Sequence, residues 1–321
     1  MKTKSKHIIL GAGGAIGQPL AEELISKGES VKLVSRNARA ILGAEVFKAD
    51  LTDSAQVNNA VEKSSIVYLL AGLPYSISVW REQWPRIMRN TVEACEAKNA
   101  KLIFFDNVYP YGKVDGKMTE ETPINPCSRK GEVRAKIAEY LLAEVAEKKV
   151  DALIARSADF YGPYANTTSP PFILIIEKLA KGKRAMPLGD VNTVHSYTYT
   201  LDCAKALYLL AGKESAFNQV WHLPTAAPPL TGRQFMQLVA DKLGTSVKYF
   251  PLSKNFLKLG GLFTVQLREV AEMMYQSERN YIFDSSKFEQ QFGFKPTPYD
   301  VGIEETIAHF RQNGTIPNER V

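Results

Sequence analysis

A glycine-rich segment close to the beginning of the chain constrains the fold more than any other feature. The apolar run from His7 to Leu10 leads into four glycines, and apolar residues at helical spacing follow. Glycines between a strand and a helix allow a tight turn, close approach of the backbone to a pyrophosphate, and free N–H groups at the helix N-terminus. The segment therefore predicts a dinucleotide-binding loop. The residues expected to contact the dinucleotide here are Gly11, Gly13, Gly14, Ala15, Ile16 and Gly17.

Apolar runs alternate with helical patterns through the first half of the chain. We expect strands near residues 8–10, 31–35, 45–48, 66–70, 102–106 and 152–155, and helices near residues 17–27, 54–62, 79–98 and 131–148. Alternation with short connections predicts an α/β fold with a Rossmann-type, doubly wound parallel sheet. Two of the runs, near 66–70 and 102–105, are almost wholly apolar, which is typical of strands buried on both faces.

The regular alternation ends after residue 156. Prolines then punctuate residues 161–172 and 224–229, which indicates shorter and less regular elements. We therefore expect a dinucleotide-binding domain over residues 1–160, completed by a late strand near 219–223. A smaller substrate-binding lobe would comprise residues 161–200 and 224–321.

Composition excludes several classes of protein. The chain has 321 residues and a net charge of +6, and no apolar run approaches the ~20 residues of a membrane helix. We therefore expect no membrane partner. The basic residues form no stripe interleaved with aromatic residues, so we also expect no nucleic-acid partner. Three scattered cysteines without a CxxC pair suit a reducing cytoplasm. Four histidines without ligand spacing predict no metal site.

Several segments agree in order and spacing with one known family. The loop reads GxxGxxG over Gly11, Gly14 and Gly17, and the other segments are residues 50–53 (Asp-Leu-Thr-Asp), 69–72 (Leu-Leu-Ala-Gly), 106–112, 156–163 and 199–202. Over nearly the whole chain this set resembles the extended short-chain dehydrogenase/reductase family, which includes sugar-nucleotide epimerases and dehydratases. The resemblance implies a small-molecule substrate and pairing as a homodimer. It also implies a cofactor-binding role for Asp50, Leu51, Leu70, Ala71 and Gly72.

The residues after the second strand indicate which nicotinamide cofactor is bound. An acidic residue there binds the free ribose hydroxyls of NAD, whereas an arginine accommodates the additional phosphate of NADP. This chain has Ser35 and Arg36, with Arg39 close behind and no acidic residue. A guanidinium can bind a phosphate through two hydrogen bonds at once. We therefore predict NADP(H), held by Ser35 and Arg36, with NAD as the alternative.

The chain departs from the family at its catalytic residues. The family uses a Tyr-x-x-x-Lys pair on the helix before the sixth strand, and this helix contains no tyrosine before Tyr140. One alignment register places Glu132 and Lys136 at the pair, and the other places Lys130 and Arg134 there. A Tyr-x-x-x-Lys string does run from Tyr109 to Lys113, but it lies in a loop, where a spacing of four does not align two side chains.

The remaining candidates for catalysis are Asn107, which replaces the family's serine, together with Tyr109, Lys136 and Tyr161. Lys136 would also hold the nicotinamide ribose. We interpret the chain as an NADP(H)-dependent oxidoreductase of an atypical extended type that acts on an unidentified small organic substrate. The alternatives are a nucleotide-sugar epimerase or dehydratase, which the missing tyrosine disfavours, and a sensor or scaffold that binds NADP(H) without turnover.

Overall fold

The computed structural model describes residues 6–37 and 40–318, so Arg39 lies outside the described residues. The chain forms two compact units. Unit 1 contains the chain up to Gly112, together with Ile124–Arg156 and Cys203–Leu223. Unit 2 contains Lys113–Pro123, Ser157–Asp202 and the chain from Pro224 onward.

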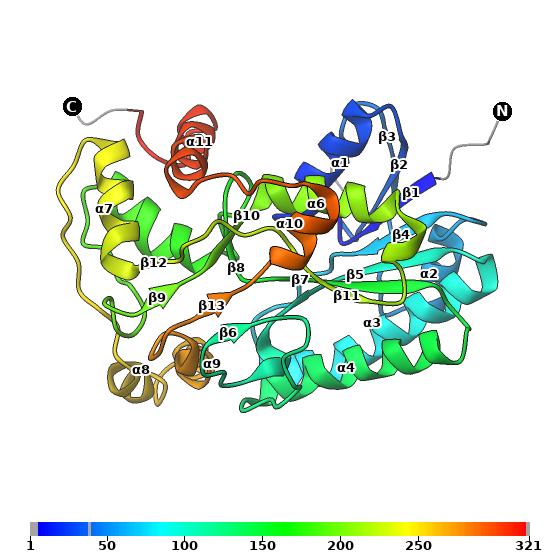
Figure 1. Ribbon diagram of the computed structural model, residues 1–321, viewed down its shortest axis with the longest axis horizontal. Helices are drawn as coiled ribbons and strands as arrows, with labels where there is room; N and C mark the ends of the chain where they lie inside the picture. The colour runs from blue at the N-terminus through cyan, green and yellow to red at the C-terminus, as the bar shows by residue number, and fades with distance from the viewer. Residues whose placement is uncertain (1–5, 38–39, 319–321) are drawn as a thin grey trace. The chain divides into compact units, whose positions relative to one another are not determined.

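A seven-stranded parallel sheet forms the centre of unit 1 (Figure 1), in the order β11-β7-β5-β4-β1-β2-β3. The strands are β1 (Lys6–Leu10), β2 (Ser30–Val34), β3 (Ala44–Phe47), β4 (Ile66–Leu69), β5 (Lys101–Asn107), β7 (Ala152–Ser157) and β11 (Val220–His222). This arrangement confirms the predicted doubly wound Rossmann-type sheet. The expected late strand is β11, which pairs with β7 in parallel.

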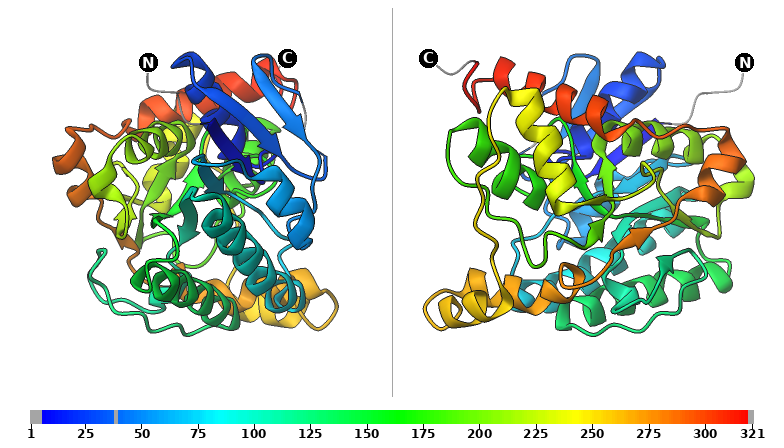
Figure 2. Two further views of the ribbon diagram at one scale, coloured as in Figure 1. Left: turned by 90° about the vertical axis from the view of Figure 1, so that its right-hand side faces the viewer. Right: turned by 60° about the vertical axis from the view of Figure 1, so that its left-hand side comes forward.

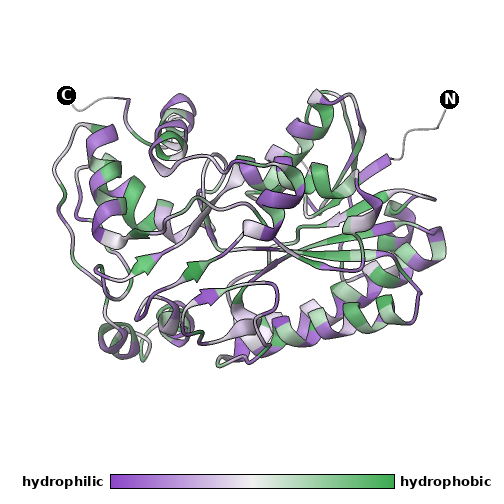
Figure 3. Ribbon diagram, viewed as in Figure 1, coloured by the Kyte–Doolittle hydropathy of each residue, from purple (hydrophilic) through white to green (hydrophobic). Residues whose placement is uncertain are grey.

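Helices cover both faces of this sheet. On one face lie α1 (Gly17–Ser26) and α6 (Thr200–Ala211), and on the other lie α2 (Ser54–Ala60), α3 (Ile77–Lys98) and α4 (Arg129–Ala146). Figure 2 shows α3 and α4 side by side. The strands are largely hydrophobic (Figure 3), and Leu69 and Phe104 have no exposed surface. Burial of these strands against the helices on each face holds the sheet together.

The order of the strands defines where a ligand is expected in unit 1. The chain leaves β1 towards β2 and β3, and then returns to the other side of β1 to form β4. In open parallel sheets, ligands bind beyond the carboxyl ends of the strands at such a reversal. The loops that follow β1, β2, β4 and β5 therefore define the candidate site.

Unit 2 is built from short elements around a core of aliphatic and aromatic residues. Its strand pairs are β8 (Asp159–Tyr161) with β10 (Tyr197–Tyr199), β9 (Val194–His195) with β12 (Leu230–Thr231), and β6 (Lys117–Met118) with β13 (Ile282–Phe283). Its helices are α5 (Glu177–Ala180), α7 (Gly232–Leu243), α8 (Lys254–Gly260), α9 (Val265–Met273), α10 (Ser286–Phe292) and α11 (Tyr299–Gln312). Within the described part of the chain, no helix combines the length and the apolarity needed to cross a membrane.

Candidate functional site

The glycine loop after β1 is shaped by close backbone contacts. Gly11 has a φ of +91°, and a Cβ atom there would lie 2.6 Å from the Cα atom of Ala71, in the loop after β4. A Cβ atom on Gly17 would lie 2.6 Å from the carbonyl oxygen of Ala12. Both distances are too short for any side chain, so these glycines bring the two loops and the start of α1 together. The loops after β1 and β4 thus meet at Gly11 and Ala71.

The other two glycines leave open space beside the backbone. Gly13 and Gly14 are exposed, and a Cβ atom on Gly13 would meet nothing within 4 Å. Among the described residues, the N–H groups of Gly13, Ala15 and Ile16 have no hydrogen-bond acceptor. The N-cap residue, Ile16, provides no side-chain cap, and the first turn of α1 contains no acidic residue. Open space, unpaired donors and the positive end of the helix dipole fit a diphosphate.

The loop after β3 forms a compact turn around Asp50. Its Oδ1 atom accepts hydrogen bonds from the backbone N–H of Thr52 at 2.9 Å and from the Thr52 hydroxyl at 2.8 Å. Asp53 caps α2 by accepting the N–H of Gln56 at 3.0 Å. The Thr52 hydrogen bonds lower the pKa of Asp50, and the nearby positive charges of Arg36 and Arg86 lower it further. Asp50 therefore stays ionised at neutral pH.

Two exposed arginines thus lie near Asp50. Arg36 follows β2, as the sequence predicts, and Arg86 comes from α3. Sequence reasoning missed Arg86 because an exposed arginine on a long helix gives no signal of its own. Ser35, whose carbonyl oxygen accepts the N–H of Ala49, connects the ends of β2 and β3. The ends of β2 and β3 and the loop after β3 therefore carry two exposed arginines near the Asp50 carboxylate.

The structure distinguishes the two ways of aligning α4 with the family's Tyr-x-x-x-Lys pair. Lys130 and Arg134 are buried, at 0% and 3% exposure, whereas Glu132 and Lys136 are exposed. Residues four apart share one helix face, and the buried face includes Lys130 and Arg134. Lys136 lies on the solvent face of α4. The expectation that Lys136 holds the nicotinamide ribose is therefore not supported, because its side chain lies on the face opposite to the one packed on the sheet.

A cluster of aromatic residues surrounds Lys130 near the carboxyl end of β5. The Lys130 ammonium lies 4.5 Å from the centre of the Tyr75 ring. The hydroxyls of Tyr75 and Tyr109 are 3.4 Å apart, and the ring of Tyr109 stacks on Trp80. Tyr75 is 40% exposed, so the phenol groups lie between a buried cation and solvent. We name Tyr75, Tyr109 and Lys130 the tyrosine–lysine cluster.

Two residues fix the position of Tyr109. The Oδ1 atom of Asn107 accepts the backbone N–H of Tyr109 at 3.0 Å, so this oxygen shapes the turn η1 (Tyr109–Tyr111). A Cβ atom on Gly131 would lie 2.7 Å from the carbonyl oxygen of Tyr109, which shows how closely η1 packs against α4. We therefore assign Asn107 a positioning role rather than a direct catalytic one.

A buried charge cluster lies beside these residues. Asp106, with no exposed side-chain surface, accepts the Arg134 Nε–H at 2.7 Å and the Arg156 Nε–H at 3.2 Å. The Arg134 guanidinium lies 4.3 Å from the Trp84 ring centre, and that of Arg156 lies 4.6 Å from the Tyr111 ring centre. Two guanidinium groups thus share one carboxylate.

Tyr161, a predicted catalytic residue, belongs to unit 2 and has no exposed surface. Its ring packs against Tyr199, Phe235 and Tyr299. A Cβ atom on Gly302 would lie 2.5 Å from its hydroxyl oxygen. Burial raises the pKa of Tyr161 well above its ordinary value, and the phenol has no exposed surface through which a substrate could reach it. We correct its assignment to packing.

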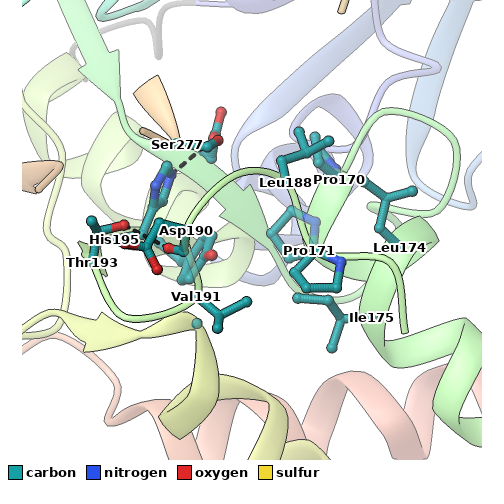
Figure 4. Close-up of a pocket in the computed structure, with 14 residues that line it drawn as sticks. Pro170, Pro171, Leu174, Ile175, Leu188, Asp190, Val191, Thr193, His195 and Ser277 are labelled. Atoms are coloured by element: carbon teal, nitrogen blue, oxygen red, sulfur yellow. Dashed lines mark hydrogen bonds and ion pairs between the residues drawn. The ribbon is translucent and has the colours of Figure 1, made fainter. Parts of the chain in front are cut away.

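Unit 2 also contains a pocket with a histidine in its wall (Figure 4). His195 Nε2 lies 3.0 Å from the Oδ2 atom of Asp159, and its ring stacks on Tyr281 at 4.2 Å between ring centres. The other walls are mainly apolar and include Pro170, Leu174 and Leu188, while Asp190 and Thr193 are polar. The lining includes no lysine or arginine. The described residues include no group of three or more His, Cys, Asp or Glu arranged to hold a metal ion.

Two curated relatives of the chain are named as enzymes. It is 25% identical to an uncharacterized UDP-glucose epimerase of Bacillus subtilis over 236 residues, which covers 65% of this chain and 73% of the relative. It is 24% identical to dTDP-4-dehydrorhamnose reductase of Aggregatibacter actinomycetemcomitans over 316 residues, which covers 95% of this chain and 99% of the relative.

Solved structures share the fold. UDP-glucose 4-epimerase of Thermus thermophilus, in complex with NAD, superposes with a TM-score of 0.79 at 20% identity, covering 95% of this chain and 99% of that one. DesIV of Streptomyces venezuelae, a dTDP-glucose 4,6-dehydratase with NAD bound, gives a TM-score of 0.81 at 17% identity, covering 97% and 99%. The profile of one family matches residues 7–222, which include the glycine loop, Asp50 and the tyrosine–lysine cluster. This chain belongs to the NAD dependent epimerase/dehydratase family.

Proposed function

We propose that this chain is an NADP(H)-dependent reductase that converts a carbonyl group of a small-molecule substrate into an alcohol. The observation that carries the proposal is the tyrosine–lysine cluster, in which two phenol groups near solvent lie beside a buried ammonium at the carboxyl edge of the sheet. The sequence predicts an oxidoreductase, and the proposal adds that its reaction runs in the direction of reduction.

The residues fit a nicotinamide dinucleotide with an additional phosphate. The N–H groups of Gly13, Ala15 and Ile16 would hold the diphosphate. Arg36 and Arg86 would hold the phosphate on the adenosine ribose, because the guanidinium binds phosphate in a forked geometry. Leu70, Ala71 and Gly72, in the loop after β4, would lie beneath the cofactor. The reduced cofactor, when bound, supplies the hydride.

The phenol groups of the cluster would then supply the proton. We assign Tyr109 as the residue that donates to the developing alkoxide, since its turn follows β5 at the ligand-binding edge. Tyr75, whose hydroxyl is 3.4 Å away, would take part in the same hydrogen-bonded chain. Lys130 would act through Tyr75 as a positioning residue, because a cation on the ring face holds the ring in place.

The proton donors of the cluster suit reduction. Its phenol groups carry O–H donors, and the cluster contains no carboxylate or imidazole. Carbonyl reduction consumes a proton. An epimerase or dehydratase that starts by oxidising an alcohol needs a base instead. We therefore prefer the reductase to these two activities.

The first substrates to test are nucleotide-linked keto sugars. A relative that aligns with 95% of this chain is named dTDP-4-dehydrorhamnose reductase, and its name describes the reduction of such a compound.

The test is NADPH consumption by the purified protein with a panel of nucleotide-linked keto sugars and simpler ketones. Tyr109→Phe should lower the rate at least about 100-fold, since general acid catalysis contributes on this scale. Tyr140→Phe, which removes a half-buried phenol elsewhere on α4, is the matched control and should leave the rate unchanged. Tight NADPH binding without consumption of any substrate would instead identify a protein that binds the cofactor without turnover.

A further inference from the structure

The connection between α8 and α9 exposes a group of large apolar side chains that the fold does not use. Leu259, Leu262, Phe263 and Val265 are 64%, 77%, 83% and 48% exposed, and Phe256 on α8 is 49% exposed. We name these five residues the α8–α9 tip. Single exposed apolar residues are ordinary, but large ones gathered in one short segment mark an interaction surface.

Residues next to the α8–α9 tip pack into a small hydrophobic core. Leu257 is buried, and it forms a small core with Leu252, Ala271 and Met274. A Cβ atom on Gly260 would lie 2.5 Å from the Leu267 side chain, and one on Gly261 would lie 3.0 Å from the Cα atom of Arg268. The two glycines therefore let α8 turn tightly onto α9, which Figure 1 shows as a pair of short helices. This turn presents Leu262 and Phe263 outward.

Basic residues predominate along the segment that contains the tip. Residues 242–268 contain five basic residues and no acidic residue, namely Lys242, Lys248, Lys254, Lys258 and Arg268. Lys242 forms an ion pair with Glu304, and Lys254 with Glu278. The nearest acidic residue along α9, Glu269, is buried. Lys248, Lys258 and Arg268 are exposed and have no ion-pair partner among the described residues.

We propose that the α8–α9 tip docks on an anionic lipid surface, inserting Leu262 and Phe263 between headgroups while Lys258 and Arg268 contact them. Exposed aromatic and aliphatic residues beside lysines and arginines are the combination that binds the membrane interface. A second copy of the chain meeting this face symmetrically would place like charges together, which is unfavourable. A protein partner would need a hollow shaped to receive the protruding side chains, whereas a bilayer interface needs no fixed shape.

This inference revises one expectation from the sequence. The expectation of no membrane partner rested on the absence of an apolar run long enough to span a bilayer. Docking on a surface needs no such run, because only a few side chains enter the interface. The inference does not depend on the proposed reductase activity.

The test is co-sedimentation of the full-length protein with vesicles of an equimolar mixture of phosphatidylglycerol and phosphatidylcholine, and with vesicles of phosphatidylcholine alone. The protein should bind the anionic vesicles, and binding should weaken as salt is added. Replacing both Leu262 and Phe263 by Ser should weaken binding at least about tenfold. Lys258→Gln and Arg268→Gln should each weaken it roughly fivefold.

The controls are Val301→Ser and Lys63→Gln, which remove an exposed apolar residue and an exposed lysine elsewhere and should leave binding unchanged. Circular dichroism should show that every variant keeps the wild-type fold. Equal binding to both kinds of vesicle, or binding to neither, would overturn the proposal. It would also be overturned if light scattering showed that the Leu262→Ser, Phe263→Ser variant only converts an oligomer into a monomer.

Discussion

Asp106→Asn should lower the free energy of unfolding of unit 1, because it removes the carboxylate from the buried charge cluster. Asp106 neutralises two guanidinium groups, on Arg134 and Arg156, and all three side chains are at most 4% exposed. A pair of opposite charges about 4 Å apart is worth about 4 kcal/mol at an effective dielectric constant near 20. Two such attractions amount to about 8 kcal/mol. Part of this is offset, because the neutral amide no longer incurs the several kcal/mol of carboxylate desolvation.

The expected loss in the free energy of unfolding is therefore about 3–5 kcal/mol, as found when one member of a buried ion pair is removed. Denaturant unfolding followed by tryptophan fluorescence measures this directly. The chain has three tryptophans, and Trp80, Trp84 and Trp221 all belong to unit 1. The fluorescence therefore reports the unit that contains the cluster.

The matched control is Glu23→Gln, which removes a carboxylate 3.4 Å from the Lys27 ammonium on the surface of α1. This change should alter the stability by no more than about 0.5 kcal/mol, because exposed pairs within a helix contribute little. If Asp106→Asn unfolds at the same denaturant concentration as the wild type and as Glu23→Gln, the reasoning about the buried cluster is wrong.

Three further predictions concern the cofactor, the turn after β5 and unit 2. Arg36→Ser and Arg86→Ser should each weaken NADP⁺ binding about tenfold and leave NAD⁺ binding unchanged, since a charged hydrogen bond contributes about 1.5 kcal/mol; calorimetry with both cofactors checks this. Gly131→Ala should destabilise unit 1 by about 1–3 kcal/mol, measured by tryptophan fluorescence, because its Cβ atom would lie 2.7 Å from the Tyr109 carbonyl oxygen. Burial raises the pKa of Tyr299 from 10.0 to about 12. The folded state thus favours the neutral phenol. The contribution of Tyr299 to the free energy of unfolding is therefore fully present below pH 10 and is lost as the pH rises from 10 through about 12. A circular dichroism titration should show Tyr299→Phe to be less sensitive than the wild type in this range, and equal sensitivity would contradict the assignment.

Much of unit 1 could be predicted from the sequence because its signals are local. The apolar runs predicted the strands to within one or two residues, and the glycine loop predicted the turn between β1 and α1. The Asp-Leu-Thr-Asp segment, which the family resemblance singles out, forms a turn held by hydrogen bonds of Asp50 and Asp53. Each of these features depends on residues within a few positions of one another.

The register of α4 could not be predicted, because it depends on contacts between distant segments. Residue type alone does not tell whether Lys130 or Lys136 lies on the solvent face of the helix. Lys130 is buried because Tyr75, in the loop before α3, covers it. Arg134 is buried because Asp106, at the end of β5, pairs with it. The same limit applies to Tyr161, since its burial depends on residues more than 30 positions away.

The most direct test of the account is a calorimetric titration of the purified protein with NADP⁺ and with NAD⁺. The unpaired N–H groups of the glycine loop should bind the diphosphate of either compound, and Arg36 and Arg86 should add affinity for NADP⁺ alone. The account predicts that NADP⁺ binds at least about tenfold more tightly than NAD⁺. Equal or tighter binding of NAD⁺, or no heat of binding with either compound, would contradict it.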